Sequence, residues 1–234
     1  MVKKYKKDDA TSYALGATLT VELIKRRPEI VRAVYVSPRS DIAAVPAAAR
    51  AHGIPVIESE KAINVLSPKG NCFAIGEFEK FTSPLSAERD HIVLVNPSDS
   101  GNLGTIMRAA AAFDAELAVI RPCADPFDPK TVRASMGAAF CINFECFDSF
   151  EQYVSRFGDR AIIPFMLNGR PFESAEFDDG KRYSLVFGNE ATGLPESYAA
   201  YDAVRIAQSD KVDSLNLSAA AAIALHRLYA AKRR

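Results

Sequence analysis

Apolar and polar positions alternate in short blocks over the first 80 residues of the chain. Three apolar or β-branched runs predict strands, at residues 32–37, 54–58 and 72–78. Three stretches with helical spacing predict helices, at residues 8–26, 41–53 and 59–67. Because strands and helices alternate, a small α/β domain is expected over residues 1–80. The proline-containing stretch at residues 81–90 has the composition of a linker.

A second and longer alternation fills residues 91–234. It begins with a nearly continuous apolar run at residues 91–96, which is typical of a strand buried on both faces. Further strands are predicted at residues 117–120, 139–147, 160–167, 183–189 and 201–208. Helices are predicted at residues 104–113, 129–136, 149–158 and 216–232, and a loop at residues 168–182. The whole chain is therefore expected to be an α/β protein.

The overall charge gives only a weak indication of a partner. Of the 234 residues, 48% are hydrophobic, and 29 basic residues balance 29 acidic ones, which excludes a chain-wide basic field for nucleic acid. The balance is uneven, however, because residues 1–80 hold 13 Lys or Arg against 9 Asp or Glu, and the remainder holds 16 against 20. An anionic partner is therefore expected to contact the N-terminal part.

The cysteines and histidines are scattered along the chain. The four cysteines form no C-x-x-C pair and the three histidines are far apart, so no metal site is expected. Apolar neighbours, as in the stretch AFCINFECF, indicate reduced core cysteines. No apolar run approaches the roughly 20 residues of a membrane span, and the N-terminus lacks the apolar core of a signal peptide. We therefore expect a cytoplasmic protein without a membrane partner.

The stretch NPSDSGNLGTIMR at residues 96–108 has the composition of a glycine loop that leads into a helix. It lacks the lysine of a Walker loop and has only two of the three glycines of a dinucleotide fingerprint. Asp99 would also repel a phosphate. A nucleotide-dependent enzyme that holds phosphate here is disfavoured and is kept as an alternative.

Two further clusters follow predicted strands. In LVFGNEATGLPESY (185–198), Gly188 comes directly after a buried run, and Gly193 and Pro195 precede a predicted helix. A ligand-binding turn and a plain strand-to-helix turn are both consistent with this pattern. In VDSLNLSAAAAIAL (212–225), the run of polar residues before the helix offers more N-cap candidates than one helix needs.

These stretches, together with KTVRASMGAAF (130–140), resemble in order and spacing the SpoU (TrmH) branch of the SPOUT RNA methyltransferases. The N-x-G-x-x-x-R motif corresponds to Asn102, Gly104 and Arg108. The G-N-E-x-x-G motif corresponds to Gly188, Asn189, Glu190 and Gly193. The S-L-N-[VL]-S and R-A-S-x-G-A motifs correspond to residues 214–218 and 133–138, and the resemblance covers residues 90–230.

The resemblance implies a fold and an assembly. Residues 91–234 would form a SPOUT-type α/β catalytic domain with a C-terminal deep trefoil knot, which is otherwise nearly absent from proteins. Residues 1–80 look like the L30e-like substrate-binding domain of some members, with residues 81–90 as the linker. Family resemblance also implies a homodimer through the catalytic domain.

The implied reaction is S-adenosylmethionine-dependent methyl transfer to a ribose 2′-hydroxyl of structured RNA. By analogy the N-terminal domain favours ribosomal RNA over transfer RNA. The resemblance places Gly188, Ile206 and Leu215 at the cofactor site, largely through their backbone groups. A catalytically silent RNA-binding member is the alternative, because IAQSD at residues 206–210 replaces the usual IPMxG.

The resemblance also suggests catalytic residues. Arg108 matches an arginine placed near the ribose, and because an arginine does not deprotonate in proteins, we expect it to hold phosphate or stabilise the developing oxyanion. Glu190 is expected to orient Arg108. The remaining polar positions of the site are Asn102, Ser214 and Asn216. Two residues stand where glycine is usual, Ala191 and Asp114.

Overall fold

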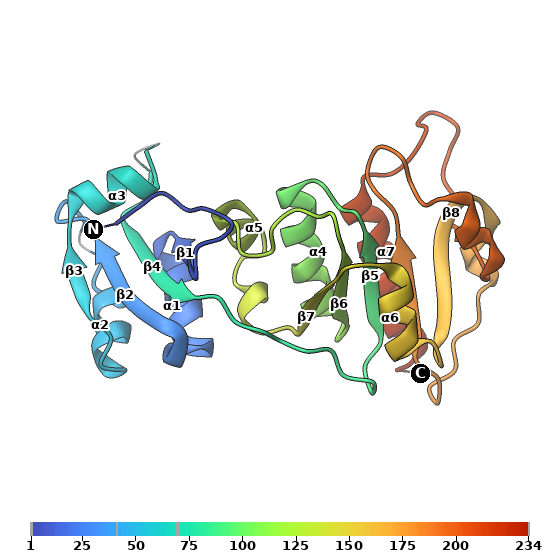
Figure 1. Cartoon of the computed structure of the whole chain (residues 1–234), viewed down its shortest axis with the longest axis horizontal. Helices are drawn as coiled ribbons and strands as arrows, with labels where there is room; N and C mark the ends of the chain where they lie inside the picture. The colour runs from blue at the N-terminus through green and yellow to red at the C-terminus, as the bar shows by residue number, and fades with distance from the viewer. Residues whose placement is uncertain (1, 41, 69–70, 234) are drawn as a thin grey trace. The chain divides into compact units, whose positions relative to one another are not determined.

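A computed structural model describes residues 2–40, 42–68 and 71–233, so the first residue of the helix predicted at 41–53 lies outside the described residues. The chain divides into two compact units (Figure 1). One contains residues 1–81 and 125–141, and the other contains residues 82–124 and 142–234. This division reflects contacts, and the domain boundaries 1–80, 81–90 and 91–234 stay predictions.

The first unit is built on a four-stranded sheet with the order β1-β4-β2-β3, in which only β2 and β3 pair in parallel. Its strands are β1 (Thr11–Leu15), β2 (Val31–Val36), β3 (Val56–Glu58) and β4 (Ala74–Glu79). Its α-helices are α1 (Ala17–Arg26), α2 (Ala44–Ala51), α3 (Glu60–Leu66) and α5 (Pro129–Ala134). The predicted strands and short helices of this region are thus confirmed, within a few residues at their ends.

The single helix predicted at residues 8–26 is wrong, because its first part is strand β1. Tyr13 and Ala14 are buried and pair with Glu77 and Gly76 of β4. Gly16 separates the strand from α1 with a φ of 113°, a backbone conformation that residues other than glycine rarely adopt. The apolar residues of this stretch have helical spacing, but pairing with β4 stabilises residues 11–15 as a strand.

The second unit is built on a six-stranded sheet with the order β10-β8-β9-β5-β6-β7. Its strands are β5 (His91–Val95), β6 (Glu116–Ile120), β7 (Phe144–Phe147), β8 (Ala161–Pro171), β9 (Tyr183–Phe187) and β10 (Val204–Arg205). Every pair of neighbouring strands is parallel. The carboxyl ends of all these strands therefore lie at one edge of the sheet, where open α/β sheets bind ligands.

Helices cover both faces of this sheet (Figure 1). On one side α4 (Ser100–Ala112) packs against α7 (Leu217–Ala231), and these helices contact β6 and β9. On the other side α6 (Phe150–Phe157) contributes Tyr153 and Phe157 to a cluster that contains Val93 and Val186. All five residues of β5 are buried, so the prediction from its continuous apolar run is confirmed.

Several predicted elements of the second unit differ in extent. Strand β8 continues to Pro171, into the predicted loop. The turn after Pro195 leads only to a short 3-10 helix, η4 (Glu196–Ala200). The stretch AFCINFECF is not one strand, because a 3-10 turn, η2 (Ala138–Phe140), precedes β7. Cys141 is consequently exposed, and its prediction as a core residue is wrong, whereas Cys72 is buried.

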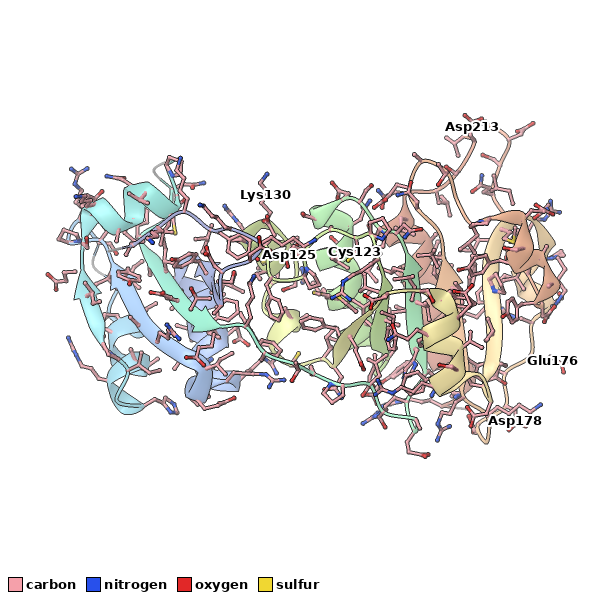
Figure 2. The ribbon with its side chains drawn as sticks, viewed as in Figure 1. Cys123, Asp125, Lys130, Glu176, Asp178 and Asp213 are labelled. Carbon is pink, nitrogen blue, oxygen red and sulfur yellow. The ribbon has the colours of Figure 1, made fainter. Side chains whose placement is uncertain are left out.

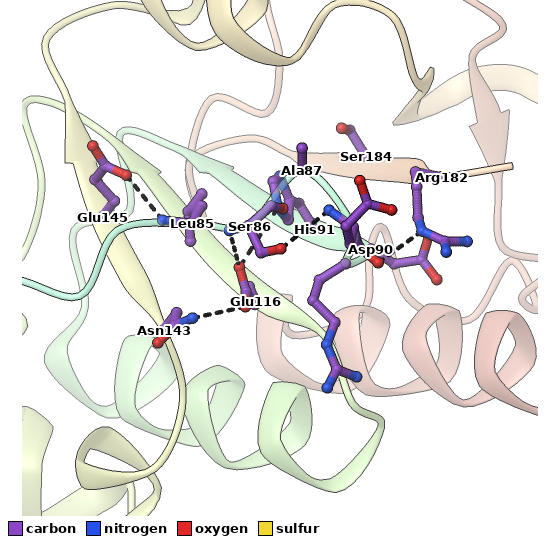
Figure 3. A network of polar contacts seen from close by, with 12 residues as sticks. Leu85, Ser86, Ala87, Asp90, His91, Glu116, Asn143, Glu145, Arg182 and Ser184 are labelled. Carbon is purple, nitrogen blue, oxygen red and sulfur yellow. Dashed lines mark hydrogen bonds and ion pairs between the residues drawn. The ribbon is translucent and has the colours of Figure 1, made fainter.

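The stretch predicted as a linker is tied to the second unit over most of its length (Figure 3). Ser86 N donates to Glu116 Oε2 over 2.7 Å, and Leu85 N donates to Glu145 Oε2 over 3.1 Å. Arg160, which is buried, donates to the carbonyls of Arg89 and Ala87 over 2.8 and 2.9 Å. These bonds satisfy backbone groups that a strand or helix would otherwise satisfy.

Candidate active site

Helix α4 begins at the carboxyl edge of the sheet, directly after β5. Asp99 is its N-cap, and Asp99 Oδ1 accepts a hydrogen bond from Asn102 N over 2.7 Å. The helix therefore starts at Ser100, four residues before the predicted start. The glycine loop of the sequence is mostly the first turn of a helix, and its polar residues are capping residues.

The carboxylate of Glu190 lies against this first turn. Its Oε2 accepts from Ser98 N over 3.0 Å and from Ser98 Oγ over 2.9 Å. Its Oε1 accepts from Asp99 N over 3.2 Å and from Asn102 Nδ2 over 3.3 Å. A carboxylate thus takes the amide donors that a bound phosphate would need, which argues against the phosphate-binding alternative.

Two opposing effects act on the pKa of Glu190. Partial burial raises it by penalising the charged form, but the hydrogen bonds from Ser98 and Asn102 lower it more, so the net pKa lies below its ordinary value. The group is therefore ionised near neutral pH. A carboxylate that is stabilised in this way is a weak proton acceptor.

Asn102 connects this carboxylate to the start of α7. Asn216 is the N-cap of α7, and its Oδ1 accepts from Ser218 N over 2.9 Å. Asn216 Nδ2 in turn donates to Asn102 Oδ1 over 3.1 Å. Asn102, Glu190 and Asn216 come from three separate stretches of the sequence, and the structure brings them together in one hydrogen-bonded chain.

The turn after β9 depends on close backbone contact. A Cβ added to Gly188 would lie 2.1 Å from Gly193 C, so only glycine fits at this position. Asn189 fixes the turn, because its Nδ2 donates to Asn96 O over 2.8 Å and its Oδ1 accepts from Ala191 N over 2.9 Å. Ala191 has no left-handed φ, so its replacement of a usual glycine causes no backbone strain.

Arg108 lies apart from this chain of polar contacts. It is exposed on α4, and among the residues that the structure describes it has no ion pair or hydrogen bond. The four hydrogen bonds of Glu190 go to Ser98, Asp99 and Asn102 instead. The expectation that Glu190 orients Arg108 is therefore wrong for this structure, and Glu190 positions the first turn of α4.

A pocket of about 450 Å³ opens beside the turn after β9. Gly188, Ile206 and Leu215, the three residues expected at a cofactor site, all line it, as do Glu190 and Ser214. Phe165 and Phe187 also line it, and their rings stack with centroids 4.3 Å apart. No local pattern in the sequence indicates Phe165, because only the pairing of β8 with β9 brings it next to Phe187.

Two other features were not found among the described residues. Within the described ranges, no group of three His, Cys, Asp or Glu side chains is arranged to hold a metal ion. Across the same ranges, none of the helices combines the length and the apolar composition that crossing a membrane requires.

Comparisons with known proteins identify the family of the chain. The model of the SpoU rRNA Methylase family matches residues 90–226. The crystal structure of an AdoMet-bound rRNA methyltransferase from Sinorhizobium meliloti is 28% identical, with a TM-score of 0.80, and covers 94% of this chain and 87% of that chain. A structure described for the 2-OH methylation of C/U34 on tRNA is 29% identical, with a TM-score of 0.58, and covers 62% of this chain and 97% of that chain. A Bacillus subtilis 23S rRNA (guanosine(2553)-2'-O)-methyltransferase is 28% identical over 156 residues, which are 62% of this chain and 59% of that protein.

Proposed function

Because the chain belongs to the SpoU rRNA Methylase family and is therefore an S-adenosylmethionine-dependent RNA methyltransferase, we propose that it methylates a ribose 2′-hydroxyl of structured RNA. One observation carries the proposal: the hydrogen-bonded chain of Asn102, Glu190 and Asn216 lies beside the pocket lined by Gly188, Ile206 and Leu215. Residues that match three separate motifs thus meet at one edge of the sheet.

The pocket is suited to S-adenosylmethionine. Its volume of about 450 Å³ lies within the range of small-molecule sites. Gly188 keeps its backbone free of a side chain, Leu215 and Ile206 add apolar walls, and the aromatic pair of Phe165 and Phe187 provides a flat surface. When bound, the cofactor supplies an electrophilic methyl group on its sulfonium.

The protein's own residues have to place the ribose and balance its charge. We assign Arg108 to the RNA, because its guanidinium is exposed and has no partner among the residues that the structure describes, so it can hold a phosphate or a developing oxyanion. Glu190 and Asn102 keep the first turn of α4 in place, and Asn216 does the same for α7. Ser214, which is exposed at the pocket, faces the substrate or cofactor side in this proposal.

We propose ribosomal RNA as the substrate. The support is that the Sinorhizobium meliloti rRNA methyltransferase resembles 94% of this chain, including the N-terminal part, whereas the structure concerned with tRNA resembles only 62%. The excess of Lys and Arg in residues 1–80 favours RNA binding there. Binding should then weaken as salt is raised, and salt-independent binding would contradict this placement.

The same proposal includes the finer features of the family. These are a trefoil knot in the catalytic domain, an L30e-like fold for residues 1–80, a homodimer through the catalytic domain and a cytoplasmic location. The homodimer rests on the resemblance to the family. Light scattering of the purified chain would test it, and a monomer at all concentrations would contradict it.

The central experiment replaces Arg108 with lysine. We expect Arg108→Lys to lower kcat/KM by on the order of 100-fold, because a point charge cannot make the paired hydrogen bonds of a guanidinium. Calorimetric affinity for S-adenosylhomocysteine should stay unchanged. Arg89→Lys is the matched control, because Arg89 is an exposed arginine of the same unit that pairs with Asp114.

Each outcome of this experiment is informative. Near-full activity of Arg108→Lys would refute the proposed role of Arg108. Mapping of 2′-O-methyl groups in RNA from cells that lack the protein would test the substrate, and loss of a site in transfer RNA alone would refute ribosomal RNA. RNA binding without S-adenosylhomocysteine binding would support a catalytically silent member instead.

A further inference from the structure

The loop between β10 and α7 forms one side of the pocket. Ile206 and Gln208 line the pocket at the beginning of this loop, and Ser214 and Leu215 line it at the end. Residues 207–214 are all exposed. Figure 2 shows Asp213 on a loop that projects away from the helices and strands. The position of the loop therefore decides whether both of its ends reach the pocket wall.

One side chain joins the two ends of this loop. Gln208 Nε2 donates to Val212 O over 3.3 Å and to Asp213 O over 3.1 Å. Over the described part of the chain, residues 207–214 make no hydrogen bond or ion pair besides these two. Val212 is 52% exposed and so provides little apolar anchoring. A segment with so few contacts opens at low cost in free energy.

We propose that Gln208 is a positioning residue that holds this loop closed against the pocket and thereby sets the affinity for S-adenosylmethionine. The inference rests on the proposed placement of the cofactor in this pocket. A loop that is ordered before binding loses less conformational entropy when the ligand binds, so the two hydrogen bonds of Gln208 raise the affinity. The amide of Gln208 acts through the backbone at Val212 and Asp213, which keeps Ser214 and Leu215 at the wall.

Trypsin cleavage after Lys211 reports loop opening in the ligand-free protein, because Lys211 is an exposed residue inside the loop. Gln208→Ala removes the amide, and Gln208→Glu keeps its size but cannot donate at neutral pH. We expect both variants to be cleaved after Lys211 faster, by on the order of tenfold. Gln152→Ala is the matched control, because Gln152 also bonds the backbone, at Asp148 N, but lies on α6. Unchanged cleavage in both Gln208 variants would overturn the proposal.

Calorimetry with S-adenosylhomocysteine tests the consequence for affinity. We expect Kd to rise by on the order of tenfold in Gln208→Ala and Gln208→Glu. Gln152→Ala should bind like the wild-type protein. For the methylation reaction, the KM for S-adenosylmethionine should rise while kcat at saturating cofactor stays unchanged.

The two measurements separate the possible failures. Faster cleavage with unchanged affinity would show that Gln208 keeps the loop closed without affecting the affinity for the cofactor, and it would overturn the inference. Weaker affinity with unchanged cleavage would show that Gln208 contacts the ligand directly, which also overturns it. Absence of binding by the wild-type protein would refute the proposed cofactor site, whereas the cleavage rates would still show whether Gln208 closes the loop.

Discussion

Replacement of Glu190 with glutamine isolates the charge that joins the turn after β9 to α4. The carboxylate accepts four hydrogen bonds, from Ser98 N, Ser98 Oγ, Asp99 N and Asn102 Nδ2. Glutamine retains one acceptor oxygen, so it keeps the bonds on one side only. Its amide group would then point two hydrogens at donors on the other side, where no hydrogen bond forms.

The magnitude follows from the kind of bond that is lost. Hydrogen bonds to charged groups contribute about 1.5–3 kcal/mol each, but Glu190 is only partly buried and the bonds share one carboxylate, so we expect a total loss of about 1.5–3 kcal/mol. For a protein of this size that loss lowers the melting temperature by about 3–12 °C. Glu196→Gln is the matched control, because Glu196 lines the same pocket but accepts one long bond of 3.5 Å.

The effect must also depend on pH in a defined direction. Because the folded-state pKa of Glu190 lies below its ordinary value of 4.5, its contribution is fully present above that value and is lost as pH falls through the folded pKa. The stability difference between wild type and Glu190→Gln should therefore be largest at neutral pH and shrink in acid. Thermal melting of both proteins from pH 7 down to pH 3 measures it. A difference that is absent at pH 7, or that persists unchanged in acid, would refute the reasoning.

Two further substitutions test other parts of the second unit. Gly188→Ala should destabilise the protein by about 3 kcal/mol or more, because its Cβ would overlap the backbone of Gly193. Ala191→Gly should change the stability by less than about 0.5 kcal/mol. Thermal melting compares the two variants, and equal effects would contradict the close contact at Gly188. Burial, together with the nearby Arg160 guanidinium, lowers the pKa of His91 to about 3, so its contribution to stability is complete above pH 6.5 and is lost as pH falls toward 3. His91→Gln should remove about 1.4 kcal/mol per pH unit from the pH dependence of unfolding in that range, as measured by urea denaturation, and an unchanged slope would show that His91 is not the titrating group.

Much of the second unit was predictable because its signals are local. The apolar run of β5 is buried on both faces, as expected for a central parallel strand. The polar residues before α7 predicted the start of the helix correctly, since Asn216 is the N-cap. Gly188, Ile206 and Leu215 lie in one pocket because each follows or precedes an element at the carboxyl edge of the sheet. Asp114 stands where the family usually has glycine, and its φ is 60°. Glycine adopts such a positive φ without steric cost, which explains why it is usual at this position.

What the sequence alone determined, then, is which residues are chemically available and where most helices and strands lie, because capping, periodicity and glycine requirements act over a few neighbouring residues. The partners of those residues were decided only by the tertiary structure. Glu190 is 88 residues from Asn102, yet it bonds Asn102 and not Arg108, because parallel pairing of β5 and β9 brings their following turns together. In the same way, strand pairing with β4 made residues 11–15 a strand, against their helical spacing. Contacts between distant segments satisfy backbone and side-chain groups whose partners no local pattern identifies.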